Sequence, residues 1–363
     1  MKFRNFKMVN YVVFGRGSFN QLEEILSSNR KGNAPMVFLV DHFFAPGSGG
    51  EKKEFVKRIP IQGNDKLIYA DVTHEPKTSY VDKIANQLKE EFGQVSGIIG
   101  IGGGSAMDLA KAVSLMMTNP GSASDYQGWD LVRNPGVYKA GIPTLSGTGA
   151  EVSRTTVLTG PTKKLGMNSD FTPFDQIVLD PELTEGVPAN QRFYTGMDCY
   201  IHCIESLQGT YLNEFSKSYG EKALELCQHV FLEKAHWDEE SDDQLMMASY
   251  AGGMSIAYSQ VGVAHAVSYG LSYLLGTKHG IGNCIVFDKL GEFYPEGVKE
   301  FKKMVEKNKI DIPQQITKGL SDKDFDTMIN VSLGMKPLWE NALGRDWEKK
   351  MTREKLRRLY ESL

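Results

Sequence analysis

The sequence has no marked excess of either charge and few cysteines. Its 363 residues include 41 Lys and Arg against 45 Asp and Glu, a net charge of −4, so neither nucleic acid nor a membrane surface is an expected partner. Four cysteines are too few for a disulfide framework, which indicates a cytoplasmic protein. The stretch 245–277 lacks acidic and basic residues, but its many Ser, Gly and Tyr residues favour a buried helix pair over a membrane span.

Hydrophobic patterns divide the chain into two parts, as its length also suggests. In the first part, short apolar runs alternate with helical spacing, which is typical of a parallel sheet covered by helices. The expected strands are Tyr11–Phe14, Met36–Val40, Leu67–Ala70 and Gly97–Ile101. The expected helices are Phe19–Leu26, Glu51–Arg58, Tyr80–Phe92 and Ala106–Met117.

From about Pro188 onward the pattern is helical. We therefore predict an α/β domain over residues 1–184 and an all-helical domain over residues 185–363, joined near Pro181–Pro188. The charge-rich C-terminus, 347–363, is expected to form a solvated helix.

A glycine-rich loop follows the strand expected at Gly97–Ile101. It consists of Gly102, Gly103, Gly104 and Ser105, and a helical pattern begins directly after it. Glycines without Cβ atoms let backbone N–H groups approach a phosphate, and a helix N-terminus adds partial positive charge. The same residues also fit a tight turn with Ser105 as helix N-cap.

Two further polar segments fit a nucleotide site. Asp41 ends an expected strand, where its carboxylate fits both hydroxyls of an adenosine ribose and would repel a 2′-phosphate, favouring NAD over NADP. Asp41 equally fits a helix cap or a loop. The loop 143–151, rich in Gly, Ser and Thr, fits either the rest of a nucleotide cradle or a turn.

Metal-ligating residues occur in the helical part. Asp198 and His202 are four residues apart, which places both on one helix face. His265 lies in the uncharged stretch, and His279 follows it. One carboxylate and three imidazoles suit Fe²⁺ or Zn²⁺. Taken singly, each histidine also fits an ordinary core or surface position, while Cys199 and Cys203 fit small buried side chains better than a thiolate zinc site.

In order and spacing, these motifs resemble the iron-containing (group III) alcohol dehydrogenases, which share the dehydroquinate synthase-like fold. The motifs are Gly102-Gly103-Gly104-Ser105-x-x-Asp108, Gly147-Thr148-Gly149-x-Glu151, Asp198-x-x-x-His202, His265 and His279-Gly280. The resemblance implies an α/β nucleotide-binding domain, an all-α metal-binding domain, NAD as cofactor and a homodimer.

The resemblance also assigns roles to individual residues. The implied metal ligands are Asp198, His202, His265 and His279. The implied cofactor contacts are Gly102 to Ser105 for the pyrophosphate, Asp41 for the ribose, Thr144, Thr148 and Lys164 near the nicotinamide, and Leu183 packed against the cofactor. Many relatives carry a second histidine where this sequence has Tyr269, which is therefore a candidate for proton release. The segment before His265 is also about two residues shorter than the common form.

The expected substrate is an alcohol or a sugar acid. Arg154 is a candidate for binding a substrate carboxylate, although a surface position suits it as well. The short chain is similar to a branch that oxidises C8 of 3-deoxy-D-manno-octulosonate for lipopolysaccharide. The alternatives are a dehydrogenase of a small aliphatic alcohol or diol, a dehydroquinate-synthase-like lyase, and a non-enzymatic nucleotide-binding protein.

Overall fold

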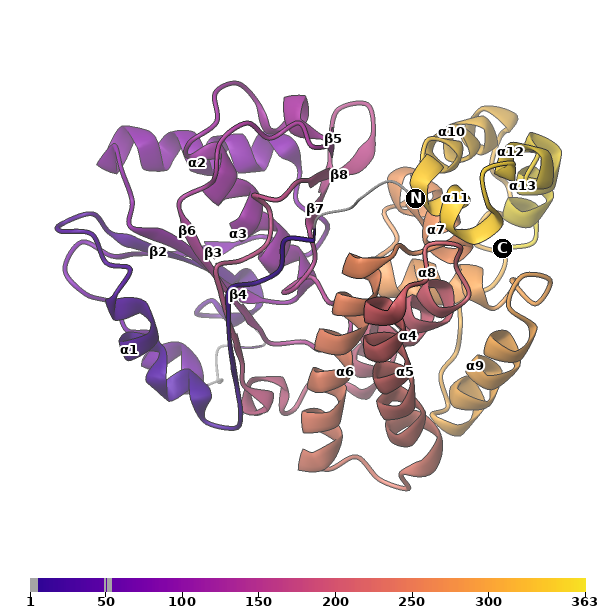
Figure 1. Ribbon diagram of the computed structural model, residues 1–363, viewed down its shortest axis with the longest axis horizontal. Coiled ribbons are helices and arrows are strands. Elements are labelled where there is room, and N and C mark those ends of the chain that lie inside the picture. Colours follow the sequence, from indigo (N-terminus) through magenta and orange to yellow (C-terminus); the bar gives the residue numbers. More distant parts are fainter. Residues whose placement is uncertain (1–5, 49, 51–53) are drawn as a thin grey trace. The chain divides into compact units, whose positions relative to one another are not determined.

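The computed structural model describes residues 6–48, 50 and 54–363 (Figure 1). The chain forms two compact units, one made of the residues up to 145 and of 150–185, the other of 146–149 and 186–363. The chain crosses between the units three times, and the predicted boundary between residues 184 and 185 lies one residue before the third crossing.

The first unit is built on a six-stranded sheet in which every neighbouring pair is parallel. The strand order is β1-β9-β6-β4-β2-β3. These strands are β1 (Tyr11–Phe14), β2 (Met36–Asp41), β3 (Lys66–Ala70), β4 (Gly97–Gly102), β6 (Tyr138–Pro143) and β9 (Gln176–Leu179). A second, three-stranded sheet contains β5 (Gly128–Trp129), β7 (Thr155–Thr159) and β8 (Lys164–Asn168).

Helices cover both faces of the large sheet. One face buries Phe38 and Ile99 in a cluster with Leu22 and Leu26 of α1 (Leu22–Ser27). On the other face, a Cβ added to Gly100 would lie 2.6 Å from Cβ of Ala110. The missing side chain therefore lets the helix that carries Ala110 pack closely on the sheet. The covering helices on this side are α2 (Thr78–Phe92) and α3 (Gly104–Met116). Short 3₁₀ turns complete the unit: η1 (Ser18–Gln21), η2 (His42–Phe44), η3 (Glu54–Arg58), η4 (Ala123–Tyr126) and η5 (Pro181–Thr184).

The four expected strands are confirmed to within one residue at each end. The expected helix Phe19–Leu26 is divided instead into η1 and α1. Of the expected helix Glu51–Arg58, residues 51–53 lie outside the described residues, and the rest forms the 3₁₀ helix η3. Pro60 follows closely, and a proline disfavours the α conformation of the residue before it.

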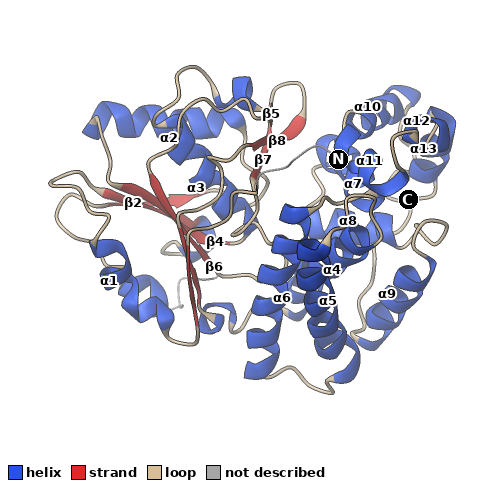
Figure 2. Cartoon of the chain, viewed as in Figure 1, coloured by secondary structure: helices blue, strands red, loops and turns tan. Residues whose placement is uncertain are grey.

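The second unit consists of helices joined by loops, with no strand among its described residues (Figure 2). Its elements are α4 (Ala189–Leu207), α5 (Glu214–Gln228), the π-helical turn η6 (His229–Glu233), α6 (Glu239–Tyr258), α7 (Val263–Leu275), α8 (His279–Phe287), α9 (Pro295–Lys307), α10 (Asp322–Leu333), α11 (Lys336–Leu343), α12 (Trp347–Lys350) and α13 (Arg353–Glu361). The predicted fold class, an α/β unit followed by a helical unit, is therefore confirmed.

The uncharged stretch 245–277 forms most of α6 and all of α7, the expected buried pair. Among the described residues, no helix is both long and apolar enough to cross a membrane. The C-terminal segment is less solvated than expected, because Tyr360 of α13 is fully buried and donates a hydrogen bond to the Val267 carbonyl of α7 at 2.8 Å. All four cysteines are buried and unbridged, and burial was predicted for Cys199 and Cys203.

Candidate metal centre and nucleotide loop

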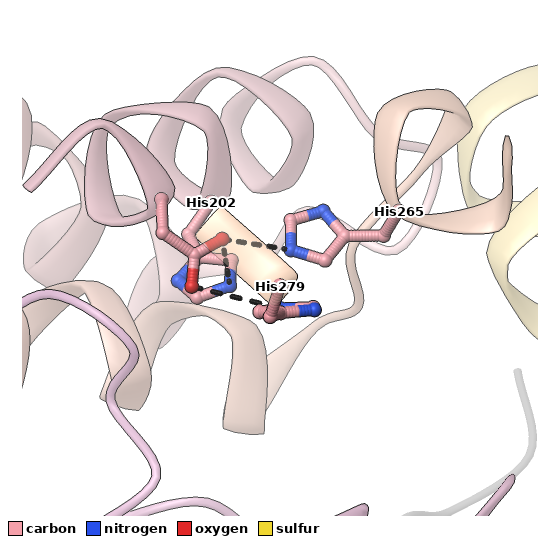
Figure 3. A group of neighbouring side chains, drawn as sticks. His202, His265 and His279 are labelled. Atoms are coloured by element: carbon pink, nitrogen blue, oxygen red, sulfur yellow. Dashed lines mark ion pairs between the residues drawn. The ribbon is translucent and has the colours of Figure 1, made fainter. Parts of the chain in front are cut away.

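Three helices of the second unit bring the four expected metal ligands together. Asp198 and His202 lie one turn apart on α4, and both are buried. His265 lies in the first turn of α7, and His279 is the first residue of α8. Figure 3 shows the three imidazoles converging on a carboxylate.

The distances between the ligand atoms fit a single bound ion. Asp198 Oδ1 lies 3.8 Å from Nε2 of His202 and 3.4 Å from Nε2 of His265. Asp198 Oδ2 lies 3.6 Å from Nε2 of His279, and all four ligand atoms lie within 4.8 Å of one another. Ligands about 2.1 Å from a tetrahedral ion are about 3.4 Å apart, which is close to these separations.

The protonation states of Asp198 and His202 suit a cation. Burial alone would raise the pKa of Asp198, but the neighbouring imidazoles, led by His279, hold it well below its usual range. Burial lowers the pKa of His202 to about 3, so its imidazole is neutral and able to ligate. Burial would lower the pKa of His265, but the carboxylates of Glu205 and Asp198 raise it to about 9, so a bound ion displaces a proton from that ring. Among the described residues, Asp198 Oδ2 has no hydrogen-bond partner although it is buried. The side chain of His279 is 25% exposed, which leaves the site accessible. The four residues therefore fit Fe²⁺ or Zn²⁺.

Glu205 is a residue of this site that the sequence analysis missed. It is buried on α4, and its two carboxylate oxygens accept hydrogen bonds from the Ala264 backbone N–H and from Nδ1 of His265, each at 2.6 Å. A carboxylate in this position fixes the ring so that Nε2 faces the metal. It also places a negative charge at the N-terminus of α7, where the helix dipole favours it.

Asn283 on α8, whose Nδ2 donates a hydrogen bond to Asp198 Oδ1 at 2.6 Å, was missed as well, although a signal for both residues was present. Glu205 follows His202 by three residues and Asn283 follows His279 by four, so each shares a helix face with a metal ligand. Tyr269, the candidate for proton release, lies one turn after His265. Its ring is nearly perpendicular to that of His279, with centroids 6.2 Å apart.

The glycine loop joins β4 to α3 in the first unit. Gly103, rather than Ser105, is the N-cap of α3, and Ser105 lies inside the first turn. Gly103 provides no side-chain hydrogen bond to the first helical N–H groups, which leaves backbone donors for an anion. Gly102 has φ of +153°, and a Cβ there would lie 2.6 Å from Cβ of Ala106 and 2.9 Å from Cβ of Asp41. Only glycine fits this crowded position.

The loop lies where the sheet topology favours ligand binding. The chain passes from β2 to the edge strand β3 and then returns to β4 on the other side of β2. Ligands of such sheets bind at the carboxyl ends of the strands where the order reverses. Asp41 ends β2, Gly102 ends β4, and Thr144 follows the neighbouring β6, with its N–H donating to the Gly102 carbonyl at 2.9 Å. Asp41 also accepts a hydrogen bond from the Phe43 N–H at 2.9 Å.

The structure places Thr148 in the helical unit, separate from Thr144. The glycines on either side of Thr148 have positive φ, +141° at Gly147 and +63° at Gly149. A Cβ at Gly147 would lie 1.8 Å from the Thr195 carbonyl oxygen of α4. These glycines are therefore needed for close packing against helices, which a simple turn would not require.

Arg154 is engaged within the first unit. Its guanidinium donates from Nε to Asp170 at 2.9 Å and from a terminal nitrogen to Asp130 at 2.5 Å. These two bonds occupy N–H groups of the guanidinium that would otherwise bind a substrate carboxylate by two parallel hydrogen bonds. We therefore assign Arg154 to the support of the loops around the three-stranded sheet rather than to the substrate.

Lys164 and Leu183 are both buried in the first unit. Lys164 lies on β8, and its Nζ is 2.5 Å from Oε1 of Glu75. Leu183 is 2% exposed and belongs to the core cluster against the large sheet. Neither residue lies on the strand ends that carry Asp41, Gly102 and Thr144.

Comparisons with known proteins agree with this geometry. The family model "Iron-containing alcohol dehydrogenase" matches residues 10–181, and "Fe-containing alcohol dehydrogenase family, C-terminal" matches residues 192–328. The chain is 30% identical to a sulfoacetaldehyde reductase of Bilophila wadsworthia over 280 residues, 75% of this chain and 70% of that protein. It is 30% identical to an NAD-dependent methanol dehydrogenase of Bacillus methanolicus over 287 residues, 77% of this chain and 73% of that protein.

A solved structure supports the fold. The alcohol dehydrogenase from Oenococcus oeni superposes with a TM-score of 0.81 over 99% of both chains, at 21% identity. The chain belongs to the iron-containing alcohol dehydrogenase family and is an oxidoreductase acting on CH–OH groups.

Proposed function

We propose that the protein is an NAD-linked, metal-dependent alcohol dehydrogenase that transfers a hydride between an alcohol carbon and C4 of nicotinamide. The observation that carries the proposal is the buried group of Asp198, His202, His265 and His279, whose ligand atoms lie within 4.8 Å of one another. When bound there, a divalent ion supplies Lewis acidity that favours loss of the alcohol proton.

The chain's own residues orient the reactants. In the first unit, the N–H groups at Gly103 to Ser105 bind the pyrophosphate, and the carboxylate of Asp41 accepts the adenosine ribose hydroxyls. In the second unit, Glu205 orients the ring of His265. Tyr269, whose ring lies beside that of His279, passes the released proton to water through its hydroxyl. The family resemblance remains the only support for cofactor contacts by four further residues, Thr144, Thr148, Lys164 and Leu183.

Asp41→Asn is expected to raise the preference for NADP over NAD by about tenfold, which corresponds to about 1.4 kcal/mol. The carboxylate repels a 2′-phosphate, whereas asparagine keeps the shape and still accepts the Phe43 N–H bond. Steady-state kcat/KM with both cofactors measures the change. Asp71→Asn, on the loop after the neighbouring strand β3, is the control and should leave the ratio unchanged. An unchanged ratio in the Asp41 variant would exclude its ribose role.

For the substrate we propose a sugar acid, with oxidation at C8 of 3-deoxy-D-manno-octulosonate as part of lipopolysaccharide sugar synthesis. The support is the sequence resemblance to that branch. Because Arg154 is bonded to two aspartates, the exposed Lys278 directly before His279 becomes the candidate partner of the substrate carboxylate. A small aliphatic alcohol or diol is the second candidate, since one relative is named a methanol dehydrogenase.

The proposal is tested by following NAD reduction at 340 nm with zinc-loaded and with iron-loaded protein. The substrates compared are 3-deoxy-D-manno-octulosonate, butanol, methanol and 1,3-propanediol. The sugar acid should give the highest kcat/KM, and Lys278→Ala should raise its KM without affecting butanol. Lys289→Ala, a lysine bonded to Gln314 instead, is the control. Absence of hydride transfer from every alcohol would overturn the function, whereas turnover of butanol alone would overturn only the sugar acid.

We also propose a homodimer that forms through β1. This strand is an edge of the large sheet among the described residues, and it exposes Tyr11 by 68% and Phe14 by 48%. Exposed apolar edge strands favour pairing with another chain. We expect the double variant Tyr11→Lys, Phe14→Lys to be a monomer where the wild type is a dimer, as measured by light scattering. Phe43 is 50% exposed and lies outside the sheet, so Phe43→Lys should leave the mass unchanged. A monomeric wild-type protein would contradict the proposal.

A further inference from the structure

Asn283 contacts three of the four expected metal ligands. It is fully buried on α8, one turn after His279. Its Nδ2 donates to Asp198 Oδ1 at 2.6 Å and lies 3.0 Å from Nε2 of His265 and 3.2 Å from Nε2 of His279. These three atoms are the ones that would coordinate an ion.

The hydrogen bonds of Asn283 are poorly balanced for a residue that only fills the core. An amide nitrogen carries two hydrogens, and here it faces three ligand atoms. The amide oxygen is buried, and the described residues offer it no hydrogen-bond partner. A buried polar atom without a partner costs free energy that leucine, of similar size, would avoid. The position of the amide is therefore explained by the ligands that it faces.

We propose that Asn283 belongs to the metal centre as a positioning residue that fixes the carboxylate of Asp198. The inference rests on the proposed metal site. A carboxylate oxygen accepts more than one partner, so the bond from Asn283 to Asp198 is compatible with a bound ion. The Nε2 atom of a neutral imidazole has a single lone pair, so the contacts with His265 and His279 are given up when an ion binds.

Asn283 therefore has two effects on the centre. Before the ion binds, its amide holds the acceptor atoms of three helices toward one point. After the ion binds, the bond to Asp198 continues to set the direction of the carboxylate. Partners of this kind influence metal affinity because they orient the ligating atom.

Zinc affinity of the full chain, stripped of metal and titrated against a chromophoric chelator, tests the inference. Asn283→Leu is expected to weaken zinc binding by about 10- to 100-fold. Asn283→Ser, which is smaller and too short to reach Asp198, provides a second variant if the leucine variant does not fold, and should weaken binding similarly. Asn119→Leu removes a buried asparagine of the first unit that donates only to backbone carbonyls and the Thr118 hydroxyl, and should bind zinc like wild type.

Thermal melting separates positioning from packing. Asn283→Asp keeps the shape but places a carboxylate against Asp198, so the metal-free variant should melt below wild type and gain more from zinc than wild type does. The inference would be overturned if Asn283→Leu and Asn283→Ser bound zinc as tightly as Asn119→Leu does. Failure of wild type to bind either zinc or iron would instead overturn the metal site and the proposed function.

Discussion

Replacing Asp198 by Asn is expected to remove bound metal from the purified protein and to abolish alcohol oxidation. Asp198 supplies the only negative charge among the four ligands, and it is completely buried. Two unit charges 4 Å apart attract by about 4 kcal/mol at an effective dielectric constant of 20, which corresponds to about a thousandfold in affinity. Asparagine preserves the size of the side chain, so the effect reports the charge and not a cavity.

Metal content by mass spectrometry and NAD reduction at 340 nm measure this effect together. The control is Asp242→Asn, which makes the same change at a largely buried aspartate on α6 that accepts from the Trp237 indole N–H at 2.8 Å and lies 3.8 Å from the Arg192 guanidinium. It should retain both metal and activity. One metal ion per chain in the Asp198 variant, with activity near that of wild type, would show that the site described here is not the catalytic one.

Local spacing predicted only part of this site. The helical period placed Asp198 and His202 on one face, and the strand ends placed Asp41 and the glycine loop at one edge of the sheet. The residue types suggested that His265 and His279 could join them, but only the family resemblance assigned both as ligands, because spacing along the chain does not show how α7 and α8 pack against α4. Glu205 and Asn283 were missed because they act through hydrogen bonds to the ligands.

Arg154 illustrates a limit of reasoning from sequence. Its partners Asp130 and Asp170 lie 24 and 16 residues away, and pairing within the small sheet brings their loops together. No local pattern reveals such pairs, so the guanidinium appeared available for a substrate. Ser105 is a smaller case, since Gly103 takes the N-cap position by backbone conformation alone.

The fold was predicted best where a strand is continuous and apolar. Buried parallel strands such as β2 and β4 show this pattern because helices cover both faces. Strand β6 was not expected, since it contains Lys139 and ends in Pro143. The structure accommodates Lys139 because it is buried beside Asp175, with Nζ 3.8 Å from the carboxylate.

Glu205→Gln is expected to weaken metal binding by about 100-fold although every metal ligand remains. Glu205 accepts two hydrogen bonds, one on each oxygen, from the Ala264 N–H and His265 Nδ1. Glutamine has one acceptor oxygen. If this oxygen stays on the Ala264 N–H, the amide N–H faces Nδ1 of His265 and moves the ring hydrogen to Nε2, the atom that must bind the metal. If the amide is reversed, its N–H opposes the N–H of Ala264 in the first turn of α7.

The two outcomes are separable by ¹⁵N shifts of the His265 ring, which report the nitrogen that carries the hydrogen, and by thermal melting. With the amide oxygen on the Ala264 N–H, the His265 tautomer should change. With the amide reversed, the tautomer should be retained and the Tm should fall. Zinc binding should be weaker in both cases. Glu300→Gln changes the same charge on α9, where the carboxylate accepts from the Gln228 amide at 2.9 Å, and should not alter zinc affinity. Unchanged zinc affinity in the Glu205 variant would show that packing alone, without the carboxylate, holds the imidazole in its ligating orientation.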